Sequence, residues 1–399
     1  MLQVGGGIPF YRSHGILRHG MSPSRDDQDG EPGTEQWSFR TDGSVQSSPA
    51  VVDGTVYVGS DDSCMYALDA MTGTQQWAFK TGDRVESSPI VVGDTVYVTS
   101  LDTNVYALNV GDGTERWSFK TGGLNSPSPA VVDGTVYVGS RDGHVYALDA
   151  TTGTERWAFR TGRWVRSAPA VVDGTVYVGS GYWESENGTI YALDAESGTE
   201  QWSFQTDGGV TSDPAVVSGT VYVGTWDKHV YALDAADGTE RWSFETSVPE
   251  SSPLVVDGTV YVGSYSDAVH ALDAATGAEQ WSFQAGDDVC SSPTVVDGTA
   301  YIGSRDDAVY ALDAATGTET WSVRTDGDVI SAPTVVDETA YVGSFDDTVY
   351  ALDADTGTEQ WAFRTDGDVT ASPTVVDGTV YVGSHDGCVY AITAHQRPE

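Results

Sequence analysis

The chain has 399 residues, of which 39% are hydrophobic, 11% aromatic and 20% charged. Asp and Glu number 59 against 19 Lys and Arg, which gives a formal net charge of −40 at pH 7. Because binding to a phosphate backbone requires a basic surface, this balance argues strongly against DNA or RNA as a partner.

The segment 1–32 precedes the regular part of the sequence and is rich in Gly and Pro. Its charged residues form a basic stretch followed by an acidic one: Arg12, His14, Arg18, His19, Arg25, then Asp26, Asp27 and Asp29. We expect this segment to be disordered. No apolar run has the length of a signal peptide or of a membrane span. The sequence therefore predicts a cytoplasmic protein, or a secreted or cell-surface one if the start of the chain is misassigned.

A motif of the form Ala-x-Asp-x-x-x-Gly-x-x-x-Trp recurs along the rest of the chain at a spacing of about 40 residues. One copy comprises Ala67, Asp69, Gly73 and Trp77. The repeated tryptophans are Trp37, Trp77, Trp117, Trp157, Trp202, Trp242, Trp281, Trp321 and Trp361. The one large departure from the period is an insertion at 181–188. A fixed period of this length indicates one supersecondary unit repeated along the chain.

Each unit is predicted to contain four short strands. An apolar run, Ser48–Val52, is followed by Asp53-Gly54, a dipeptide typical of a type I′ hairpin turn. The other three strands are expected at Thr55–Ser60, Met65–Asp69 and Thr74–Lys80, and no part of the unit has helical periodicity. Four antiparallel strands in a unit of this length predict the blade of a β-propeller, with strands A to D running from the axis outward.

The two ends of the repeat array complement each other. The array begins with a D strand, Gly33–Trp37, and ends with a C strand, Val389–Ile392, that lacks a D strand. Pairing the two would close the ring and cover two open sheet edges. We therefore predict an all-β fold, a single propeller of nine four-stranded antiparallel blades over residues 33–393, with a tail at 394–399. Because propellers usually have four to eight blades, eight blades with one spare unit is the alternative.

The residues of the repeat have a mechanical interpretation. An indole on the outer strand can lie between neighbouring blades, and the small residues Ala67 and Gly73 leave room for it. Asp69 precedes a Thr-Gly turn and can accept hydrogen bonds from its N–H groups. The Asp residues of the B–C turns, such as Asp62, are interpreted as turn-forming rather than as calcium ligands. His270 replaces a Tyr of the repeat, and we expect it to be packed.

The repeat resembles the tryptophan-docking motif of the pyrroloquinoline-quinone (PQQ) repeat superfamily, over about residues 33–393. That superfamily contains quinoprotein dehydrogenases and non-enzymatic propellers, such as the bacterial lipoprotein that assists outer-membrane assembly. The dehydrogenases are expected to have an adjacent cysteine pair over the quinone and a calcium-ligating set. Here Cys64, Cys290 and Cys388 are far apart, and we expect no disulfide among them. We therefore expect neither cofactor nor metal, and an oxidoreductase that binds PQQ with calcium is the alternative.

The acidic residues are spread evenly through the repeats, and the lysines are only Lys80, Lys120 and Lys228. This composition resembles that of proteins from salt-saturated cytoplasms, such as those of haloarchaea. Molar salt screens the repulsion between like charges, because the Debye length falls to about 3 Å at 1 M. We therefore expect low salt to destabilise the fold.

Strand order would place the B–C and D–A loops on one face of the ring and the A–B and C–D turns on the other. The A–B and C–D turns are nearly constant in sequence, whereas the B–C and D–A loops vary and carry aromatic and Arg side chains. Binding surfaces are usually distributed in this way. The densest part combines Arg160–Arg166 with the inserted loop Gly181–Gly188. Two other interpretations stay open, which are neutral variation of exposed loops and a local ion-pair cluster with Glu184 and Glu186.

The candidate binding face comprises Arg141, Arg163, Trp164, Arg166, Tyr182, Trp183, Trp226, Lys228, Tyr265, Arg305, Phe345 and His385. Arg suits bidentate recognition of carboxylate or phosphate, so we expect a protein or a small anionic ligand as the partner. No Ser-His-Asp arrangement, HExxH or Gly-rich phosphate loop is visible, and no catalytic residue is predicted. The sequence thus predicts a monomeric, non-enzymatic binding scaffold. A repeat protein amplified from one blade without an evolved site is a further alternative.

Overall fold

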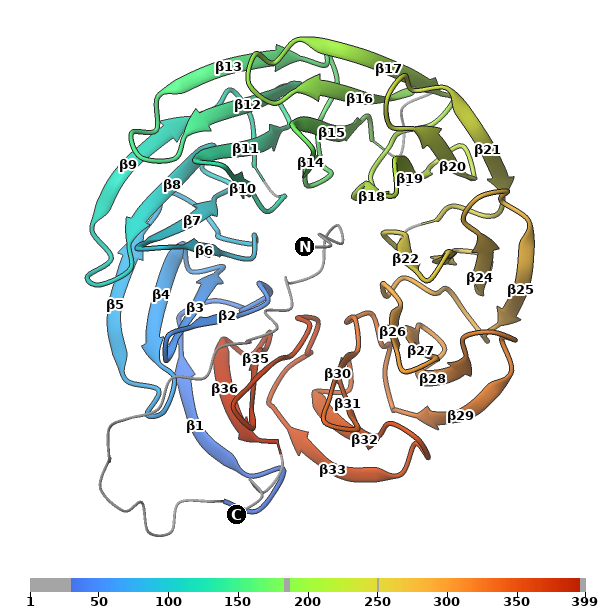
Figure 1. Cartoon of the computed structure of the whole chain (residues 1–399). Helices are drawn as coiled ribbons and strands as arrows, with labels where there is room; N and C mark the ends of the chain where they lie inside the picture. Colours follow the sequence, from blue (N-terminus) through green and yellow to red (C-terminus); the bar gives the residue numbers. More distant parts are fainter. Residues whose placement is uncertain (1–29, 126, 183–186, 250, 395–399) are drawn as a thin grey trace, which may run out of the picture.

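The structure, a computed structural model, describes residues 30–125, 127–182, 187–249 and 251–394. In these residues 36 strands form nine four-stranded antiparallel sheets, and there is no helix. The sheets surround a common axis as the blades of a propeller (Figure 1). The predicted disorder before residue 30 and the predicted tail after residue 394 lie outside the described residues.

Within a blade, strands A to D follow one another from the axis to the rim (Figure 1). Blades 1 to 3 comprise β2 (Ala50–Val52), β3 (Thr55–Ser60), β4 (Cys64–Asp69) and β5 (Gln75–Lys80); β6 (Ile90–Val92), β7 (Thr95–Thr99), β8 (Asn104–Asn109) and β9 (Glu115–Lys120); β10 (Ala130–Val132), β11 (Thr135–Ser140), β12 (His144–Asp149) and β13 (Glu155–Arg160). Blades 4 to 6 comprise β14 (Ala170–Val172), β15 (Thr175–Ser180), β16 (Gly188–Asp194) and β17 (Glu200–Thr206); β18 (Ala215–Val217), β19 (Thr220–Thr225), β20 (His229–Asp234) and β21 (Glu240–Glu245); β22 (Leu254–Val256), β23 (Thr259–Ser264), β24 (Ala268–Asp273) and β25 (Glu279–Gln284). Blades 7 and 8 comprise β26 (Thr294–Val296), β27 (Thr299–Ser304), β28 (Ala308–Asp313) and β29 (Glu319–Arg324); β30 (Thr334–Val336), β31 (Thr339–Ser344), β32 (Thr348–Asp353) and β33 (Glu359–Arg364). Blade 9 comprises β34 (Thr374–Val376), β35 (Thr379–Gly383), β36 (Cys388–Thr393) and, as its D strand, β1 (Glu35–Arg40).

The first strand of the described chain completes the last blade. β1 pairs antiparallel with β36, with Trp37 opposite Ala391. Two backbone hydrogen bonds of 2.9 Å, from Gly33 N to Thr393 O and from Thr393 N to Thr34 O, extend this pairing. The ring formed by the described residues is therefore closed by the N-terminal strand and has nine blades, as predicted. The eight-bladed alternative is wrong.

Local sequence explains the shape of each blade. In blade 1 the A–B turn, Asp53-Gly54, has φ values of 48° and 75°, which are the left-handed values that a type I′ turn requires. Every residue of β3 is buried, whereas β5 at the rim is mostly exposed. β2 begins at Ala50 and not at the predicted Ser48, because Pro49 has no N–H to donate to the sheet. Ser48 N instead donates to Ser88 Oγ of the next blade at 3.1 Å.

The core of the described chain consists of clusters between neighbouring blades rather than one central cluster. In one of them, Val56 and Val58 of blade 1 pack with Tyr381 and Val389 of blade 9. Each sheet therefore buries apolar side chains on both of its faces. This explains why a B strand such as Thr55–Ser60 is buried along its whole length and carries apolar side chains at the successive positions Val56, Tyr57 and Val58.

The nine repeated tryptophans lie between neighbouring blades at the rim. The ring of Trp37 packs on Gly73 of the next blade, where an added Cβ would be 2.5 Å from the indole Cδ2. Trp37 Nε1 donates to the carbonyl of Ala70 at 3.0 Å. The equivalent donors and acceptors are Trp77 and Val110, Trp117 and Ala150, Trp157 and Ala195, Trp202 and Ala235, Trp242 and Ala274, Trp281 and Ala314, Trp321 and Ala354, and Trp361 and Ala394. Trp361 of blade 8 packs on Gly33, which precedes β1, so the same contact is also made where the ring closes.

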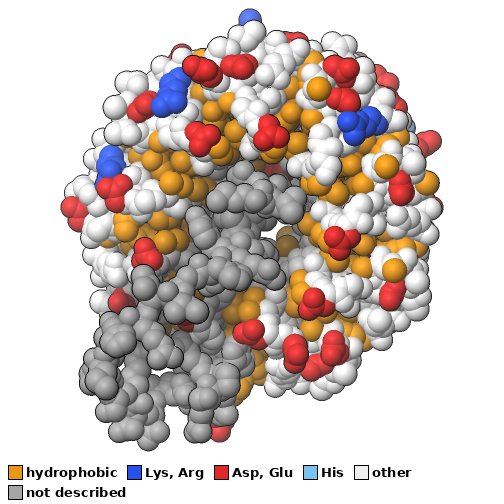
Figure 2. Space-filling view, in the orientation of Figure 1, with side chains coloured by type: hydrophobic (Ala, Val, Ile, Leu, Met, Phe, Trp, Pro, Cys, Tyr) orange, Lys and Arg blue, Asp and Glu red, His pale blue; other side chains and the backbone are white. Residues whose placement is uncertain are grey.

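Among the described residues there is no helix with the length and hydrophobicity needed to span a membrane. Where Figure 2 shows described residues, acidic side chains are spread around the face of the ring and the basic side chains form separate groups.

Candidate functional site

The B–C turns and the D–A loops form one face of the ring, which we call the loop face. Leu101 N, in the B–C turn of blade 2, donates to the carbonyl of Arg84 in the preceding D–A loop at 3.0 Å. The next residue of that loop, Val85, donates from its N to Ser60 O at the B–C turn of blade 1 at 3.1 Å. Each such D–A loop is therefore held between the B–C turns of two consecutive blades.

Two variable positions of the loop face form a side-chain pair within a blade. Gln46 Nε2 donates to Asp61 Oδ2 at 2.8 Å in blade 1, and Trp226 Nε1 donates to Thr211 Oγ1 at 2.8 Å in blade 5. The same two positions bring Arg305 Nε to Cys290 Sγ at 3.3 Å in blade 7, and Thr370 Oγ1 to His385 Nε2 at 3.0 Å in blade 9. Sequence reasoning identified both positions but missed the pairing. The available signal was a constant separation of 15 residues between chemically matched side chains.

Aromatic side chains from consecutive blades lie next to one another on part of this face. The rings of Trp164 and Tyr182 have centroids 4.9 Å apart, and the guanidinium of Arg141 lies 5.7 Å from the centroid of Trp164. The rings of Trp226 and Tyr265 form an edge-to-face pair with centroids 6.0 Å apart. We call these five residues, which come from the loops of blades 3 to 6, the aromatic sector.

One backbone segment links the two halves of the aromatic sector. Gly209 lies in the D–A loop before blade 5, and an added Cβ there would be 2.5 Å from the carbonyl oxygen of Tyr182. The carbonyl of Gly209 accepts a hydrogen bond from Trp226 N at 2.9 Å. Tyr182 and Trp226 are therefore held on the two sides of the same loop. Trp164 is 39% exposed, so its indole is available at the surface.

The remaining candidates are only partly brought together. Arg163 is exposed and Arg166 is half-buried, both in the loop that carries Trp164, and Lys228 is exposed two residues after Trp226. The others lie in blades 7 to 9, outside the aromatic sector: Arg305, Phe345 and His385. Arg305 Nη1 is 3.8 Å from Asp328 Oδ2, and His385 Nδ1 is 3.8 Å from Asp368 Oδ2. Trp183, Glu184 and Glu186 lie outside the described residues.

Charge is unevenly distributed among the D–A loops. The loops 121–128 and 161–168, which precede blades 3 and 4, contain no Asp or Glu, and the second contains Arg163 and Arg166. The loops that precede blades 7, 8 and 9 each contain two carboxylates: Asp287, Asp288, Asp326, Asp328, Asp366 and Asp368. Among the D–A loops, those before blades 3 and 4 are therefore the least acidic, but the inserted B–C loop next to them adds Glu184 and Glu186 to the sequence.

The repeated Asp of the B–C turns is turn-forming, as predicted. Asp62 Oδ1 accepts a hydrogen bond from Cys64 N at 2.9 Å, and its Oδ2 accepts from Asp42 N at 3.0 Å and from the hydroxyl of Tyr66 at 2.7 Å. Burial and this hydrogen bond to Asp62 raise the pKa of Tyr66. The C–D turn follows the prediction too, since Asp69 Oδ1 accepts from Thr72 N at 2.8 Å.

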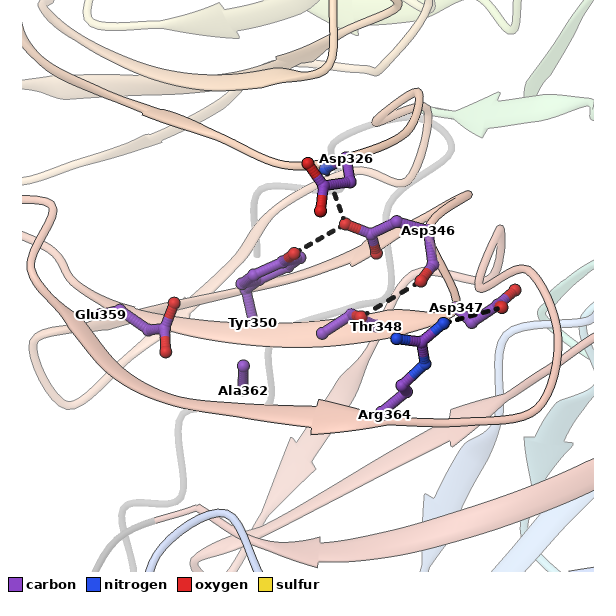
Figure 3. A pocket seen from close by; sticks show the side chains of 8 residues that line it. All are labelled: Asp326, Asp346, Asp347, Thr348, Tyr350, Glu359, Ala362 and Arg364. Atoms are coloured by element: carbon purple, nitrogen blue, oxygen red, sulfur yellow. Dashed lines mark hydrogen bonds and ion pairs between the residues drawn. The ribbon is translucent and has the colours of Figure 1, made fainter.

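The pocket shown in Figure 3 repeats this arrangement at blade 8. It has a volume of about 500 Å³. Asp346 Oδ2 accepts hydrogen bonds from Tyr350 at 2.6 Å and from Asp326 N at 2.9 Å. Arg364 lies 3.9 Å from Asp347 Oδ2. Four of the eight lining residues are carboxylates, Asp326, Asp346, Asp347 and Glu359, so the pocket does not fit an anionic ligand.

Other titratable side chains in the described part of the chain also lie close to polar side chains of the fold. His270 is packed, as expected, because its Nε2 lies 2.8 Å from Thr246 Oγ1 and its Nδ1 lies 2.9 Å from Glu279 Oε1. Three carboxylates, those of Asp267, Asp287 and Asp288, have oxygen atoms within 4.8 Å of one another. Repulsion between them adds to burial in raising the pKa of Asp288.

Among the described residues, the position before each A-strand proline does not present groups suited to PQQ, which carries three carboxylates. The residue before each A-strand proline lies near the axis, and it is Ser or Ala in all blades except blade 5, where it is Asp213. Burial raises the pKa of Asp213 to about 6, while the hydrogen bond from Ala168 N lowers it. This position therefore offers an acid where a quinone bound there would need cations. The three cysteines are thiols, so no disulfide is available to cover a quinone.

Comparison with known proteins identifies the repeat. A PQQ-repeat family model, described as the outer membrane protein assembly factor BamB, matches residues 27–122, 102–208, 141–267, 186–294 and 266–396. A comparison with curated proteins gave no match.

Solved structures share the fold at low sequence identity. BamB from Moraxella catarrhalis is 20% identical, with 90% of this chain and 99% of that chain covered and a TM-score of 0.62. The quinohemoprotein alcohol dehydrogenase from Comamonas testosteroni is 18% identical, with 92% and 77% covered and a TM-score of 0.64. The computationally designed Ika8 protein is 17% identical, with 91% and 100% covered and a TM-score of 0.63. At these identities the likeness shows the fold alone, but the family model matches almost the whole propeller, and the chain therefore belongs to the PQQ-repeat family described as the outer membrane protein assembly factor BamB.

Proposed function

We propose that this protein is a non-enzymatic scaffold that binds a polypeptide partner through the aromatic sector of its loop face. The observation that carries the proposal is the presence of two aromatic pairs, Trp164 with Tyr182 and Trp226 with Tyr265, on the two sides of the loop at Gly209. Arg141 lies beside the first pair. Trp, Tyr and Arg are the residues that most often dominate the free energy of protein–protein association. The likeness to an assembly factor supports this proposal, since assembly factors act through other proteins.

The scaffold is proposed to act as a monomer in a high-salt environment. Its net charge of −40 supports the high-salt part of this proposal, because molar salt screens the repulsion between like charges that such a surface creates. A quinone-dependent oxidoreductase is disfavoured by the acid at the position before the A-strand proline of blade 5, although quinohemoprotein dehydrogenases share the fold.

Two matched variants test the role of the aromatic sector. Trp226 and Phe345 occupy the same position of the B–C turn, in blades 5 and 8. We expect Trp226→Ala to lose a partner captured by the wild-type protein in molar KCl, and Phe345→Ala to retain it. A partner retained by both variants would remove the aromatic sector from the interface.

A titration with PQQ and calcium, followed by tryptophan fluorescence, tests the non-enzymatic part of the proposal. We expect no saturable quenching. Saturable quenching at micromolar PQQ, followed by dye reduction with alcohol substrates, would replace the scaffold by an oxidoreductase.

A further inference from the structure

A contact between two rings recurs from blade to blade in the described strands and is missing at one place. A Phe of the D strand packs on the Tyr, or on His270, of the next C strand, with centroids 5.0–5.3 Å apart. The pairs are Phe39 and Tyr66, Phe79 and Tyr106, Phe119 and Tyr146, Phe159 and Tyr191, Phe204 and Tyr231, Phe244 and His270, Phe283 and Tyr310, and Phe363 and Tyr390. In β29 of blade 7 the same position is Val323, which packs against the same core cluster as Tyr350 of blade 8 but has no ring to place on it.

The pocket of Figure 3 lies at this Tyr. Tyr350 and Ala362 are opposite each other in β32 and β33, and both line the pocket, whose volume is about 500 Å³. A Phe in place of Val323 would direct its ring toward Tyr350, as Phe283 does toward Tyr310. The shorter side chain therefore leaves the ring of Tyr350 open to a ligand. The volume is within the range of small-molecule sites, about 300–1,000 Å³.

A second exchange in blade 8 affects a carboxylate of the same pocket. In five blades the Ser that follows the docking Trp donates to the Glu three residues before it at 2.7 Å: Ser38 to Glu35, Ser118 to Glu115, Ser203 to Glu200, Ser243 to Glu240 and Ser322 to Glu319. Blade 8 has Ala362 instead, so this hydroxyl donor is missing at Glu359. Ala158 makes the same exchange in blade 3, but there Phe119 covers Tyr146. Blade 8 combines the missing ring with the missing hydroxyl.

The charge of the lining favours a cation. Four carboxylates accompany one guanidinium, that of Arg364, which is 3.9 Å from Asp347 Oδ2. Asp346 Oδ1 is buried and has no hydrogen-bond partner among the described residues, so part of the charge of this carboxylate is uncompensated. Figure 3 shows Glu359 and Arg364 on opposite sides of Tyr350, so a cation bound at Glu359 would lie away from the guanidinium.

We propose that this pocket binds a small organic cation that carries an aromatic ring, such as an arylalkylammonium. The ring of the ligand takes the place of the missing phenyl group against Tyr350, and its ammonium group binds Glu359. Aromatic faces attract both ring edges and cations, so Tyr350 suits both parts of such a ligand. The site lies between blades 7 and 8 and does not depend on the aromatic sector.

Isothermal titration of the full chain with 2-phenylethylammonium, in an amine-free buffer with about 0.5 M KCl, measures this binding. The control ligands are ethylammonium, which lacks the ring, and 3-phenylpropionate, which lacks the cation. The test variants are Val323→Phe, which supplies the ring from the chain itself, and Glu359→Gln. The matched variant, Glu319→Gln, changes the equivalent residue of blade 7, where Phe283 covers Tyr310.

We expect saturable binding at one site that weakens at least about tenfold in Val323→Phe and in Glu359→Gln and less than about twofold in Glu319→Gln. Both control ligands should bind at least about tenfold more weakly than 2-phenylethylammonium. Val323→Phe should melt no lower than the wild-type protein, because the added ring fills a cavity. No saturable binding, or undiminished binding to a folded Val323→Phe variant, would overturn the inference. Equal weakening by the two Gln variants would also overturn it, since net charge alone would then attract the ligand.

Transfer of both exchanges to blade 7 tests whether they are sufficient for the site. The variant is Phe283→Val/Ser322→Ala, and the charged residues at the equivalent places are already present in blade 7: Asp306, Asp307, Glu319 and Arg324. Asp306 Oδ1, like its counterpart in blade 8, is buried without a hydrogen-bond partner among the described residues. We expect the stoichiometry of 2-phenylethylammonium to rise from one to two. A stoichiometry that stays at one in the folded variant would overturn the assignment of the site to the missing ring and the missing hydroxyl.

Discussion

A methyl group added at Gly153 would strain the backbone and would also collide with a neighbouring indole. Its φ is 69°, and a Cβ would be 2.5 Å from Cδ2 of Trp117. Gly134, in the A–B turn of the same blade, has a φ of 71° but open space around its Cβ position. We expect Gly134→Ala to lower the free energy of unfolding by about 1–2 kcal/mol, from left-handed strain alone. Gly153→Ala should lose about 1–3 kcal/mol more, because the indole must move.

Chemical denaturation of both alanine variants in molar KCl measures this difference. The two substitutions are matched in backbone conformation and in the group added, so the comparison isolates the contact with Trp117. Equal losses in the two variants would show that the indole contact contributes nothing to stability.

Asp213 is expected to make stability depend on pH. Its carboxylate accepts a hydrogen bond from Ala168 N at 2.6 Å, in the place where Ser88 Oγ accepts one from Ser48 N. Burial raises the pKa of Asp213 to about 6, whereas an unfolded Asp titrates near 3.9. Between these values the folded chain keeps a proton that the unfolded chain has released. The contribution of Asp213 to the free energy of unfolding is therefore most favourable below about pH 4 and falls as the pH rises through 6.

Asp213→Ser removes this penalty and keeps an acceptor for Ala168 N. We expect the variant to raise the free energy of unfolding by about 1–3 kcal/mol at pH 7.5 and to change it little at pH 4. Denaturation curves at the two pH values provide the measurement. A gain of the same size at both pH values would show that the serine acts through packing rather than through the proton.

Side-chain roles that depend on sequence neighbours were predictable, and those that depend on the fold were not. Asp69 and the turn N–H of Thr72 are three residues apart, so their hydrogen bond follows from local geometry. The pair of Trp226 and Thr211 requires a D–A loop to lie against a B–C turn, which the sequence pattern does not specify. The contact between Trp164 and Tyr182 was harder still to predict, because it joins a D–A loop to an insertion that occurs in one blade.

At the scale of elements, ring closure depends on one six-residue strand, β1. Removing residues 1–40 would expose the edge of β36 and take Trp37 from its site on Gly73. We expect this truncation to lower the melting temperature by more than about 5 °C and to cause self-association through the open edge. The control, removal of residues 1–29, leaves every described strand in place.

Melting curves and light scattering of the two truncated proteins test the closure. The prediction fails if the shorter protein melts at the same temperature as the control and stays monomeric. That outcome would mean that the A strands, which are linked by bonds such as Thr374 Oγ1 to Pro49 O at 2.7 Å, hold the ring without β1.

The existence and order of the strands were predictable because the same blade pattern occurs nine times in the sequence. The strand ends were less so. The sequence pattern placed the first D strand at Gly33–Trp37, whereas β1 runs over Glu35–Arg40, because Gly33 is needed as the contact for Trp361. The pattern also started β2 too early, at Ser48, whose N–H is used by the neighbouring blade. The first error occurs where a contact between blades overrides local propensity, and in the second such a contact adds to the missing N–H of Pro49.

In the whole molecule, the residues that determine the fold lie in different segments from the residues that vary between blades. Nearly constant strands and turns encode packing, so the family and the blade number follow from them. Differences between blades are concentrated in the loop face, where nine copies of one loop plan carry different side chains. A repeat pattern can therefore indicate which face varies, but the partner depends on the few residues in which single blades differ.

The net charge of −40 should make the stability of the whole ring depend on salt. Like charges spread over all blades repel one another, and raising KCl from about 0.1 M to 1 M shortens the Debye length from about 10 Å to 3 Å. If repulsion limits stability, the melting temperature should rise by more than about 5 °C, with most of the gain below about 0.5 M KCl. If salt instead acts by strengthening apolar burial, the gain should continue above 1 M and be larger for sulfate than for chloride at equal ionic strength. Melting curves in KCl and potassium sulfate separate the two causes. An unchanged melting temperature between dilute buffer and molar KCl would show that the acidic surface serves solubility and places no demand for salt on the fold.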